Sequence, residues 1–97
     1  MNKIIVSFEF PGMTSEHYDK VMDELNKTGS LVNSGLIEHQ CGVNSKGVFV
    51  FDVWESEEAF RKFGTILIPI LNKNGVPNAH PNIIPLHNSI VQHSYSS

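Results

Sequence analysis

The sequence predicts a single α+β domain with the ferredoxin-like βαββαβ order of elements. Three observations predict it: apolar stretches with strand periodicity, two segments with helical spacing of apolar residues, and turn residues between them. Right-handed crossovers then give a four-stranded antiparallel sheet in the order 4-1-3-2, with both helices on one face. Ninety-seven residues suit one domain, which we place at residues 1–92, followed by a polar C-terminal tail at residues 93–97.

The first strand and the first helix are expected in the N-terminal third of the chain. The strand covers about residues 3–10 and stops at the turn residues Pro11 and Gly12. Thr14 is placed to cap the helix, and Gly29 is a natural C-terminal stop. Four residues at the spacing i, i+3, i+4 and i+7 predict one buried stripe: Tyr18, Val21, Met22 and Leu25.

The remaining elements are expected to be a hairpin, a second helix and a last strand. Residues 35–43 and 46–55 form the hairpin, and Ser56 caps the helix that follows. Pro69 lies inside the helical pattern and is expected to kink or split the helix near Thr65. The last strand covers about residues 82–91, where Pro85 restricts it to a sheet edge. The buried stripe of the second helix consists of Ala59, Phe60, Phe63, Leu67, Ile70 and Leu71.

Composition and charge exclude several classes of protein. The formal net charge is −3, the pI is near 5.9 and the basic residues are scattered, which disfavours nucleic-acid binding. The first apolar stretch is too short for a signal peptide or a membrane span, and Ser7 and Glu9 interrupt it. Cys41 is the only cysteine, so no disulfide forms within the chain. We therefore expect a cytoplasmic protein.

The alternation of side chains along each strand divides the sheet residues into two faces. The more apolar set is assigned to the side of the helices and consists of Ile4, Val6, Phe8, Phe10, Phe49, Phe51, Val53, Ile84, Leu86 and Ile90. The other set is assigned to the open side and consists of Ile5, Ser7, Glu9, Ile37, His39, Cys41, Val43, Val48, Val50, Asp52, Trp54, Pro85, His87, Ser89 and Val91.

The open side carries too much apolar surface to remain in water. Two helices cannot cover both faces of one sheet, and a patch of this size usually marks an interface or a ligand site. Packing two such sheets face to face buries the patch and leaves an enclosed space between them. The sequence therefore predicts a homodimer through the open sheet face, with a cleft for an apolar or amphipathic small molecule.

The hairpin fixes which residues face each other across its two strands. A tight turn at residues 44–47 places His39 opposite Asp52, Ile37 opposite Trp54, and Cys41 opposite Val50. A bulge at Gly47 would shift the register by one residue and break these pairs.

Three stretches of sequence resemble a known family. They are Phe51-Asp52-Val53-Trp54-Glu55-Ser56 followed by Glu58-Ala59-Phe60 and a helix with Leu67 and Pro69; Phe8-Glu9-Phe10-Pro11-Gly12-Met13-Thr14; and Pro85-Leu86-His87-Asn88. The chain resembles the dimeric α+β barrel superfamily, in an uncharacterised branch near the antibiotic-biosynthesis monooxygenases. The resemblance implies a homodimer whose sheets close around a small-molecule cleft. Some relatives oxidise polycyclic aromatic intermediates without a metal or flavin; others are isomerases, haem-degrading enzymes or proteins without known activity.

His39 with Asp52 is the best candidate for a catalytic pair. A carboxylate bonded to an imidazole fixes its tautomer and raises its basicity, as in a general base. The same pair can also be a structural cross-strand contact. With His87 included, the chain has the ligand types of a two-histidine, one-carboxylate iron site. The expected separation of the strands keeps His87 away from His39 and Asp52. We therefore predict neither a metal nor another cofactor.

The remaining site candidates are expected to contact a ligand rather than to react with it. Trp54 can form a flat wall for a ring or pack at the dimer interface. His87 can bind one end of a ligand or be an interface residue. The further residues expected to line the same space are Glu9, Ser7, Ile37 and Val50.

Two functions stay open at this point. The first is a cofactor-independent monooxygenase or isomerase that acts on an apolar small molecule, with His39–Asp52 as base. The second is a non-catalytic binding protein for a fatty-acid or polyketide-like ligand. RNA recognition, which uses the same topology, is rejected because Phe49 and Phe51 are expected to point to the core and the chain is acidic.

Overall fold

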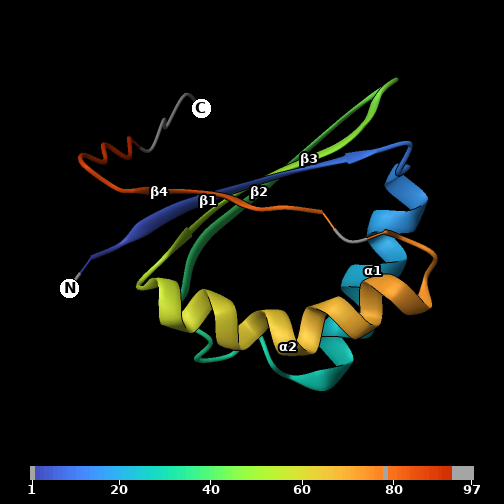
Figure 1. The fold of residues 1–97 in the computed structure, drawn as a ribbon, viewed down its shortest axis with the longest axis horizontal. Helices are drawn as coiled ribbons and strands as arrows, with labels where there is room; N and C mark the ends of the chain where they lie inside the picture. Colours follow the sequence, from blue (N-terminus) through green and yellow to red (C-terminus); the bar gives the residue numbers. More distant parts are fainter. Residues whose placement is uncertain (1, 78, 93–97) are drawn as a thin grey trace, which may run out of the picture.

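The computed structural model describes residues 2–77 and 79–92 of the chain. Its elements are β1 (Ile4–Pro11), α1 (Ser15–Thr28), β2 (Leu36–Asn44), β3 (Gly47–Trp54), α2 (Glu57–Lys73) and β4 (Asn82–Pro85). The strands form one antiparallel sheet in the order β2-β3-β1-β4, and both helices lie on one side of it (Figure 1). The expected fold class, strand order and edge position of the last strand are confirmed. The predicted tail at residues 93–97 lies outside the described residues.

Both helices begin where the sequence predicts, because a side chain caps each of them. Thr14 Oγ1 accepts a hydrogen bond from the backbone N–H of His17 at 3.2 Å, and α1 ends at Gly29 with φ 70°. Ser56 Oγ accepts from the backbone N–H of Ala59 at 3.1 Å at the start of α2.

The expected split of α2 near Thr65 does not occur, since α2 is one continuous helix of 17 residues that contains Pro69. A proline removes the hydrogen bond to the carbonyl four residues earlier, which is a local loss. Phe63 before it and Leu71 after it are both buried in the core, so packing holds the two parts of the helix on the sheet.

The assignment of β2 and β3 to the two faces is wrong. His39, Cys41 and Val43 of β2 were expected on the open side, but they share the face of the β3 residues opposite them. Ile4 pairs with Trp54 and Val6 with Asp52, and paired residues of antiparallel strands point to the same side. Val48, Val50, Asp52 and Trp54 therefore face the helices together with the core residues of β1. Trp54 is only 1% exposed and packs against Phe60 and Phe63 of α2.

The exchanged face has two consequences. Phe49, Phe51 and Val53 lie on the open side of the sheet, so the argument that Phe49 and Phe51 point to the core does not exclude RNA binding. The net charge and the acidic Glu9 and Glu38, which pair with Phe49 and Val53 on that side, still oppose a polyanion.

The last strand is shorter than expected and its faces are also exchanged. It ends at Pro85, which pairs with Ile4 on the helix side, while Ile84 pairs with Ile5 on the open side. Because β1 begins at Ile4, little strand remains for later residues to pair with; the backbone N–H of Leu86 donates to the carbonyl of Lys3 at 2.9 Å. The residues after Leu86 that were expected in this strand are exposed: His87, Ser89, Ile90 and Val91.

The hairpin register is confirmed except at its start. His39 lies opposite Asp52 and Cys41 opposite Val50, and no bulge forms at Gly47. The irregularity lies between Leu36 and Glu38, so Leu36 rather than Ile37 faces Trp54. Ile37 is the extra residue of this bulge and is 52% exposed.

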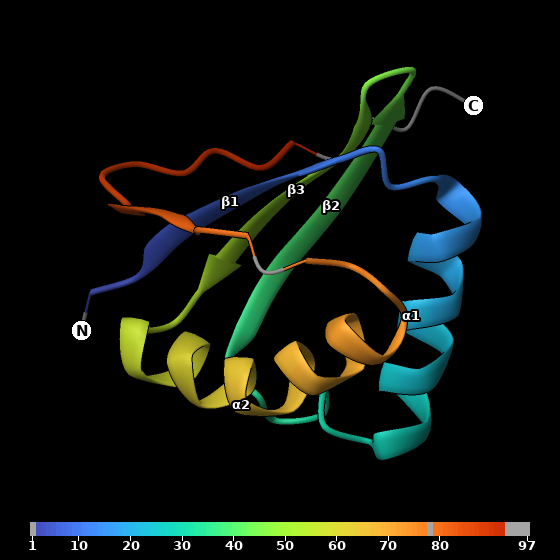
Figure 2. The same cartoon turned by 45° about the vertical axis from the view of Figure 1, so that its right-hand side comes forward.

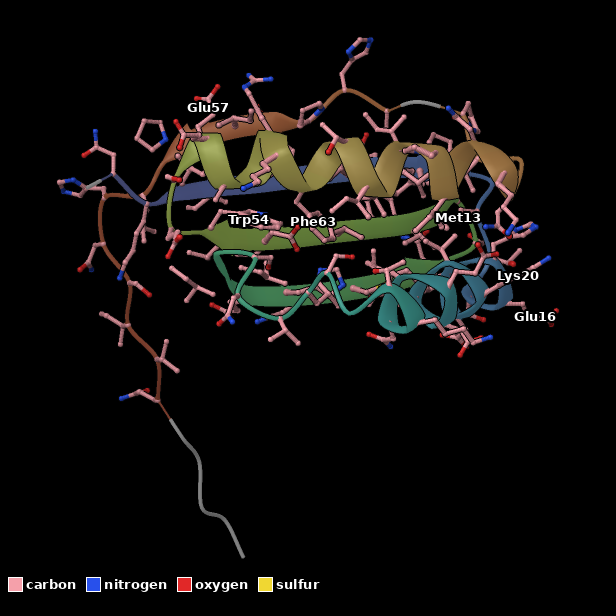
Figure 3. All side chains as sticks on the ribbon, turned by 90° about the horizontal axis from the view of Figure 1, so that it is seen from below. Met13, Glu16, Lys20, Trp54, Glu57 and Phe63 are labelled. Carbon is pink, nitrogen blue, oxygen red and sulfur yellow. The ribbon has the colours of Figure 1, made fainter. Side chains whose placement is uncertain are left out.

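The core fills the space between the sheet and the helices. Figure 2 shows α1 and α2 on the same side, with the β2–β3 hairpin extending past them. Figure 3 shows this layer with the helices toward the viewer: Trp54 and Phe63 lie in its middle part and Met13 near the end of β1. The predicted stripes of both helices are buried or half-buried there.

Candidate functional site

A cavity of about 140 Å³ lies between the sheet and the helices, not on the open side of the sheet. Its walls are apolar side chains from β1, α1, β3 and α2, such as Phe8, Leu25 and Leu67. The polar side chains that reach it come from three different elements: Tyr18 from α1, His39 from β2, and Asp52 with Trp54 from β3.

His39 and Asp52 are hydrogen-bonded across the hairpin. Nδ1 of His39 lies 2.5 Å from Oδ1 of Asp52, with the side chains 25% and 10% exposed. Oδ2 of the same carboxylate accepts a hydrogen bond from Nε1 of the buried Trp54 at 3.3 Å. Both carboxylate oxygens therefore have donors, as a buried carboxylate requires.

Tyr18 completes this arrangement from the opposite wall. Its hydroxyl oxygen lies 2.5 Å from Nε2 of His39, and the two rings are parallel to within 2°. The result is one continuous chain of hydrogen bonds, Tyr18–His39–Asp52–Trp54. The sequence interpretation assigned Tyr18 only to the apolar stripe of its helix. The only signal for its role in the sequence is the hydroxyl group. That signal becomes useful once β2 and β3 are known to point their polar residues at α1.

The cavity keeps the Tyr18 hydroxyl in its neutral form. Burial raises the pKa of Tyr18 to about 12, and nearby Cys41, Asp52 and Asp19 act in the same direction. Burial also raises the pKa of the Cys41 thiol, and Asp19 acts in the same direction, while the nearby Tyr18 hydroxyl opposes them. The thiol is therefore protonated near neutral pH, and a protonated thiol is a poor nucleophile.

The structure brings together four of the eight residues that the sequence predicted for the site. His39, Asp52, Trp54 and Val50 all line the cavity. Ile37 is in the bulge at the start of β2, and His87 is exposed beyond the end of β4.

Ser7 and Glu9 line a different hollow. It is a groove of about 590 Å³ beside the end of β1, with the loop after α2 on its other side. Glu9 is exposed and does not line the cavity between the sheet and the helices.

Two further properties concern the described part of the chain only. Within residues 2–77 and 79–92, no three His, Cys, Asp or Glu side chains lie close enough together to bind a metal ion. In the same residues, neither α1 nor α2 has the length and apolar character needed to cross a bilayer.

Sheet order, helix placement and an internal cavity define a ferredoxin-like α+β protein with a candidate small-molecule site. No protein-family model and no curated protein sequence matches the chain. Several solved structures are similar to it.

A monooxygenase from the gene ActVA-Orf6 of Streptomyces coelicolor, in complex with the ligand Nanaomycin D, has a TM-score of 0.61 and 18% identity, covering 95% of this chain and 94% of that one. A dimeric ferredoxin-like protein of unknown function from Thermobifida fusca has a TM-score of 0.61 and 14% identity, covering 88% and 92%. A hydroxynitrile lyase from Passiflora edulis has a TM-score of 0.58 and 7% identity, covering 93% and 97%.

These identities show a shared fold. They confirm the ferredoxin-like fold that the resemblance implied.

Proposed function

We propose that the chain is an enzyme that transfers a proton on a small apolar molecule bound in the cavity between sheet and helices, with the His39–Asp52 pair as its base. One observation carries this proposal: the polar side chains of an otherwise apolar cavity are joined in a single hydrogen-bonded chain that contains this pair. A ligand pocket needs few polar groups, but it needs them placed together.

The volume of the cavity limits the ligand. Drug-sized ligands use pockets of roughly 300–1,000 Å³, whereas an apolar cavity of roughly 150 Å³ binds benzene. The cavity of about 140 Å³ therefore suits one ring or a short chain, unless α1 moves away from the sheet. This favours a substrate with a single ring.

The chemistry follows from the tautomer of His39. The carboxylate of Asp52 accepts a hydrogen bond from the Nδ1–H, so Nε2 of the neutral ring carries no proton and is the basic atom. Removing a proton from a carbon or hydroxyl beside a ring system gives an anion. Returning the proton elsewhere isomerises the molecule, and reaction of the anion with dioxygen begins a cofactor-independent oxygenation.

The comparisons support this class of function. The Streptomyces coelicolor protein is a monooxygenase with an organic ligand, and the Passiflora edulis protein is a lyase, so the shared fold hosts reactions on small organic molecules. The alternative, a binding protein without a reaction, uses the same cavity and is distinguished by experiment.

Hydrogen–deuterium exchange is the direct test, because it detects proton transfer without a known product. The protein is incubated in D₂O with single-ring ketones and hydroxyarenes, and NMR follows the loss of acidic C–H signals. We expect the protein to accelerate exchange, His39→Gln to abolish the acceleration, and His80→Gln, which changes an exposed histidine outside the cavity, to preserve it. Binding without exchange, measured by calorimetry, would favour the binding protein instead.

Occupancy of the cavity is tested separately by filling it. Val50 lines the cavity from β3, and Val43 lies on the same face near the tip of the hairpin but outside it. We expect Val50→Phe to abolish ring binding and Val43→Phe to leave it unchanged. Equal binding by both variants would place the ligand elsewhere.

We also propose that the chain forms a homodimer through the open side of its sheet. The corrected faces still leave apolar surface on this side: Ile5, Phe49, Phe51 and Ile84 share it, and Phe51 and Ile84 are 42% and 50% exposed. A sheet face of this kind is normally covered. The description of the Thermobifida fusca protein as dimeric supports the proposal.

A further inference from the structure

His39 is not the group of the hydrogen-bonded chain that can meet a substrate. Its Nδ1 is bonded to Asp52 and its Nε2 to the Tyr18 hydroxyl, so both ring nitrogens are occupied. Asp52 is occupied in the same way, by His39 at one oxygen and Trp54 at the other. The Tyr18 oxygen differs, because a phenol donates one hydrogen bond and keeps lone pairs that can accept others.

The direction of the Tyr18–His39 hydrogen bond follows from the rest of the chain. Asp52 accepts from Nδ1–H, which leaves Nε2 of the neutral ring as an acceptor. Tyr18 is then the donor, and its proton points at His39 rather than into the cavity. Tyr18, His39 and Asp52 thus stand in the order of a hydroxyl, a base and an orienting carboxylate, as in nucleophile-activating triads.

We propose that Tyr18 is the catalytic residue that contacts the substrate, and that the substrate is a single-ring phenol or enol whose O–H donates to the Tyr18 oxygen. This inference rests on the proposed function and names its substrate class and contact residue. His39 and Asp52 are then positioning residues that act through Tyr18. The neutral, half-buried hydroxyl and the apolar walls suit a ligand with one hydroxyl group on an otherwise apolar body.

The proton transfer has two coupled parts. The substrate O–H bond breaks and its proton bonds to the Tyr18 oxygen, while the original Tyr18 proton moves to Nε2 of His39. The Tyr18 hydroxyl is regenerated, the substrate becomes an oxyanion, and His39 becomes an imidazolium ion whose charge Asp52 offsets. Return of a proton from His39 through Tyr18 to a ring carbon of the anion completes a tautomerisation, with no electron transfer.

The test measures the ionisation of a bound probe, 4-fluorophenol, by ¹⁹F NMR, because the fluorine shift differs between the phenol and the phenolate. We expect the wild-type protein to lower the apparent pKa of the bound probe by about one unit, which is about a tenfold increase in the ratio of phenolate to phenol. Tyr18→Phe keeps the ring and loses the hydroxyl, so the probe should bind but stay neutral, because burial without the proton relay raises the pKa of a phenol. His80→Gln should behave as wild type.

A second variant covers the case in which Tyr18→Phe does not fold. His39→Gln leaves Tyr18 in place but removes the proton acceptor behind it, so the bound probe should again stay neutral; circular dichroism checks that each variant is folded.

Two results would overturn the inference in different ways. If Tyr18→Phe bound and ionised the probe like wild type, the substrate contact would belong to another residue while the proposed function survived. If calorimetry detected no binding of 4-fluorophenol or any other single-ring probe to the wild-type protein, the proposed function would fail together with the inference.

Discussion

Oδ1 of Asp52 on β3 lies 2.5 Å from Nδ1 of His39 on β2, directly across the hairpin and beneath α1. The contact lies between the sheet and the helices, where the surrounding side chains are apolar. It determines which nitrogen of His39 is protonated, and so the direction of every hydrogen bond that continues to Tyr18.

Replacing Asp52 by Asn should disorganise this arrangement. The amide can accept from either His39 or Trp54 but presents a donor to the other, so one hydrogen bond is lost in a buried place. We expect a loss of about 1–3 kcal/mol in the free energy of unfolding and a mixture of His39 tautomers in long-range ¹H–¹⁵N NMR spectra. Asp23→Asn, which changes an exposed carboxylate on α1, is the matched control. A single unchanged tautomer in the Asp52 variant would contradict the role given to the carboxylate.

Replacing Trp54 by Phe should destabilise the protein through two losses. The variant loses packing at a side chain that is 1% exposed, and it removes the donor to Oδ2 of Asp52. We expect the free energy of unfolding to fall by roughly 2–4 kcal/mol. Because Trp54 is the only tryptophan, urea unfolding must be followed by far-UV circular dichroism instead of fluorescence. Val43→Ala, at an exposed position, should change the free energy of unfolding by less than about 0.5 kcal/mol. If Trp54→Phe lowered the free energy of unfolding by as little as Val43→Ala, the packing of Trp54 would not contribute to stability as proposed.

Tyr18 should make the stability depend on pH in the alkaline range. Its pKa is raised from 10.0 to about 12 by burial first of all, so the folded state favours the neutral phenol. This contribution is complete below the unfolded pKa of 10.0 and is lost as the pH rises toward 12. Other groups titrate in the same range, so the measurement is the difference between wild type and Tyr18→Phe in urea midpoint. We expect the urea midpoint of wild type to fall relative to that of Tyr18→Phe as the pH rises from 10.0 to about 12. A constant difference between the two midpoints would mean that the hydroxyl is not buried in solution.

Replacing Phe51 by Glu should separate a dimer formed through the open side of the sheet. Phe51 is 42% exposed in the single chain and lies on an apolar face. Glutamate at this position would place a charge there, and burying that charge in an interface is unfavourable. Analytical ultracentrifugation should find a dimer for wild type and a folded monomer for the variant. Val32→Glu changes another exposed apolar residue, which lies in the loop between α1 and β2, and should leave the dimer intact. A wild-type monomer at high concentration would remove the proposal.

Local sequence features predicted most of the fold. Thr14, Ser56 and Gly29 act on neighbouring backbone groups, so they locate the helix ends without knowledge of the tertiary structure. The pairing of His39 with Asp52 was also predictable, since a short turn determines the register of the strands that it connects. The contact between His39 and Asp52 was thus predicted, but on the wrong side of the sheet.

The place was wrong because the face of a strand depends on its partners. Phe49 and Phe51 look more suitable for a core than Val48 and Val50, and composition alone favoured them. The register of β1 with β3, which pairs Val6 with Asp52, decides the opposite. That pairing joins strands that are separated in the sequence by a helix and another strand, and no local pattern encodes it.

By itself, the sequence determined the order of the elements, their ends and the hairpin contact between a histidine and a carboxylate, because these depend on interactions over a few residues. Only the tertiary structure decided that this pair lies under the helices, that Tyr18 joins it and that His87 does not. Those outcomes depend on which distant strands share hydrogen bonds, and a shift of one residue in that pairing turns every side chain of a strand to the other face.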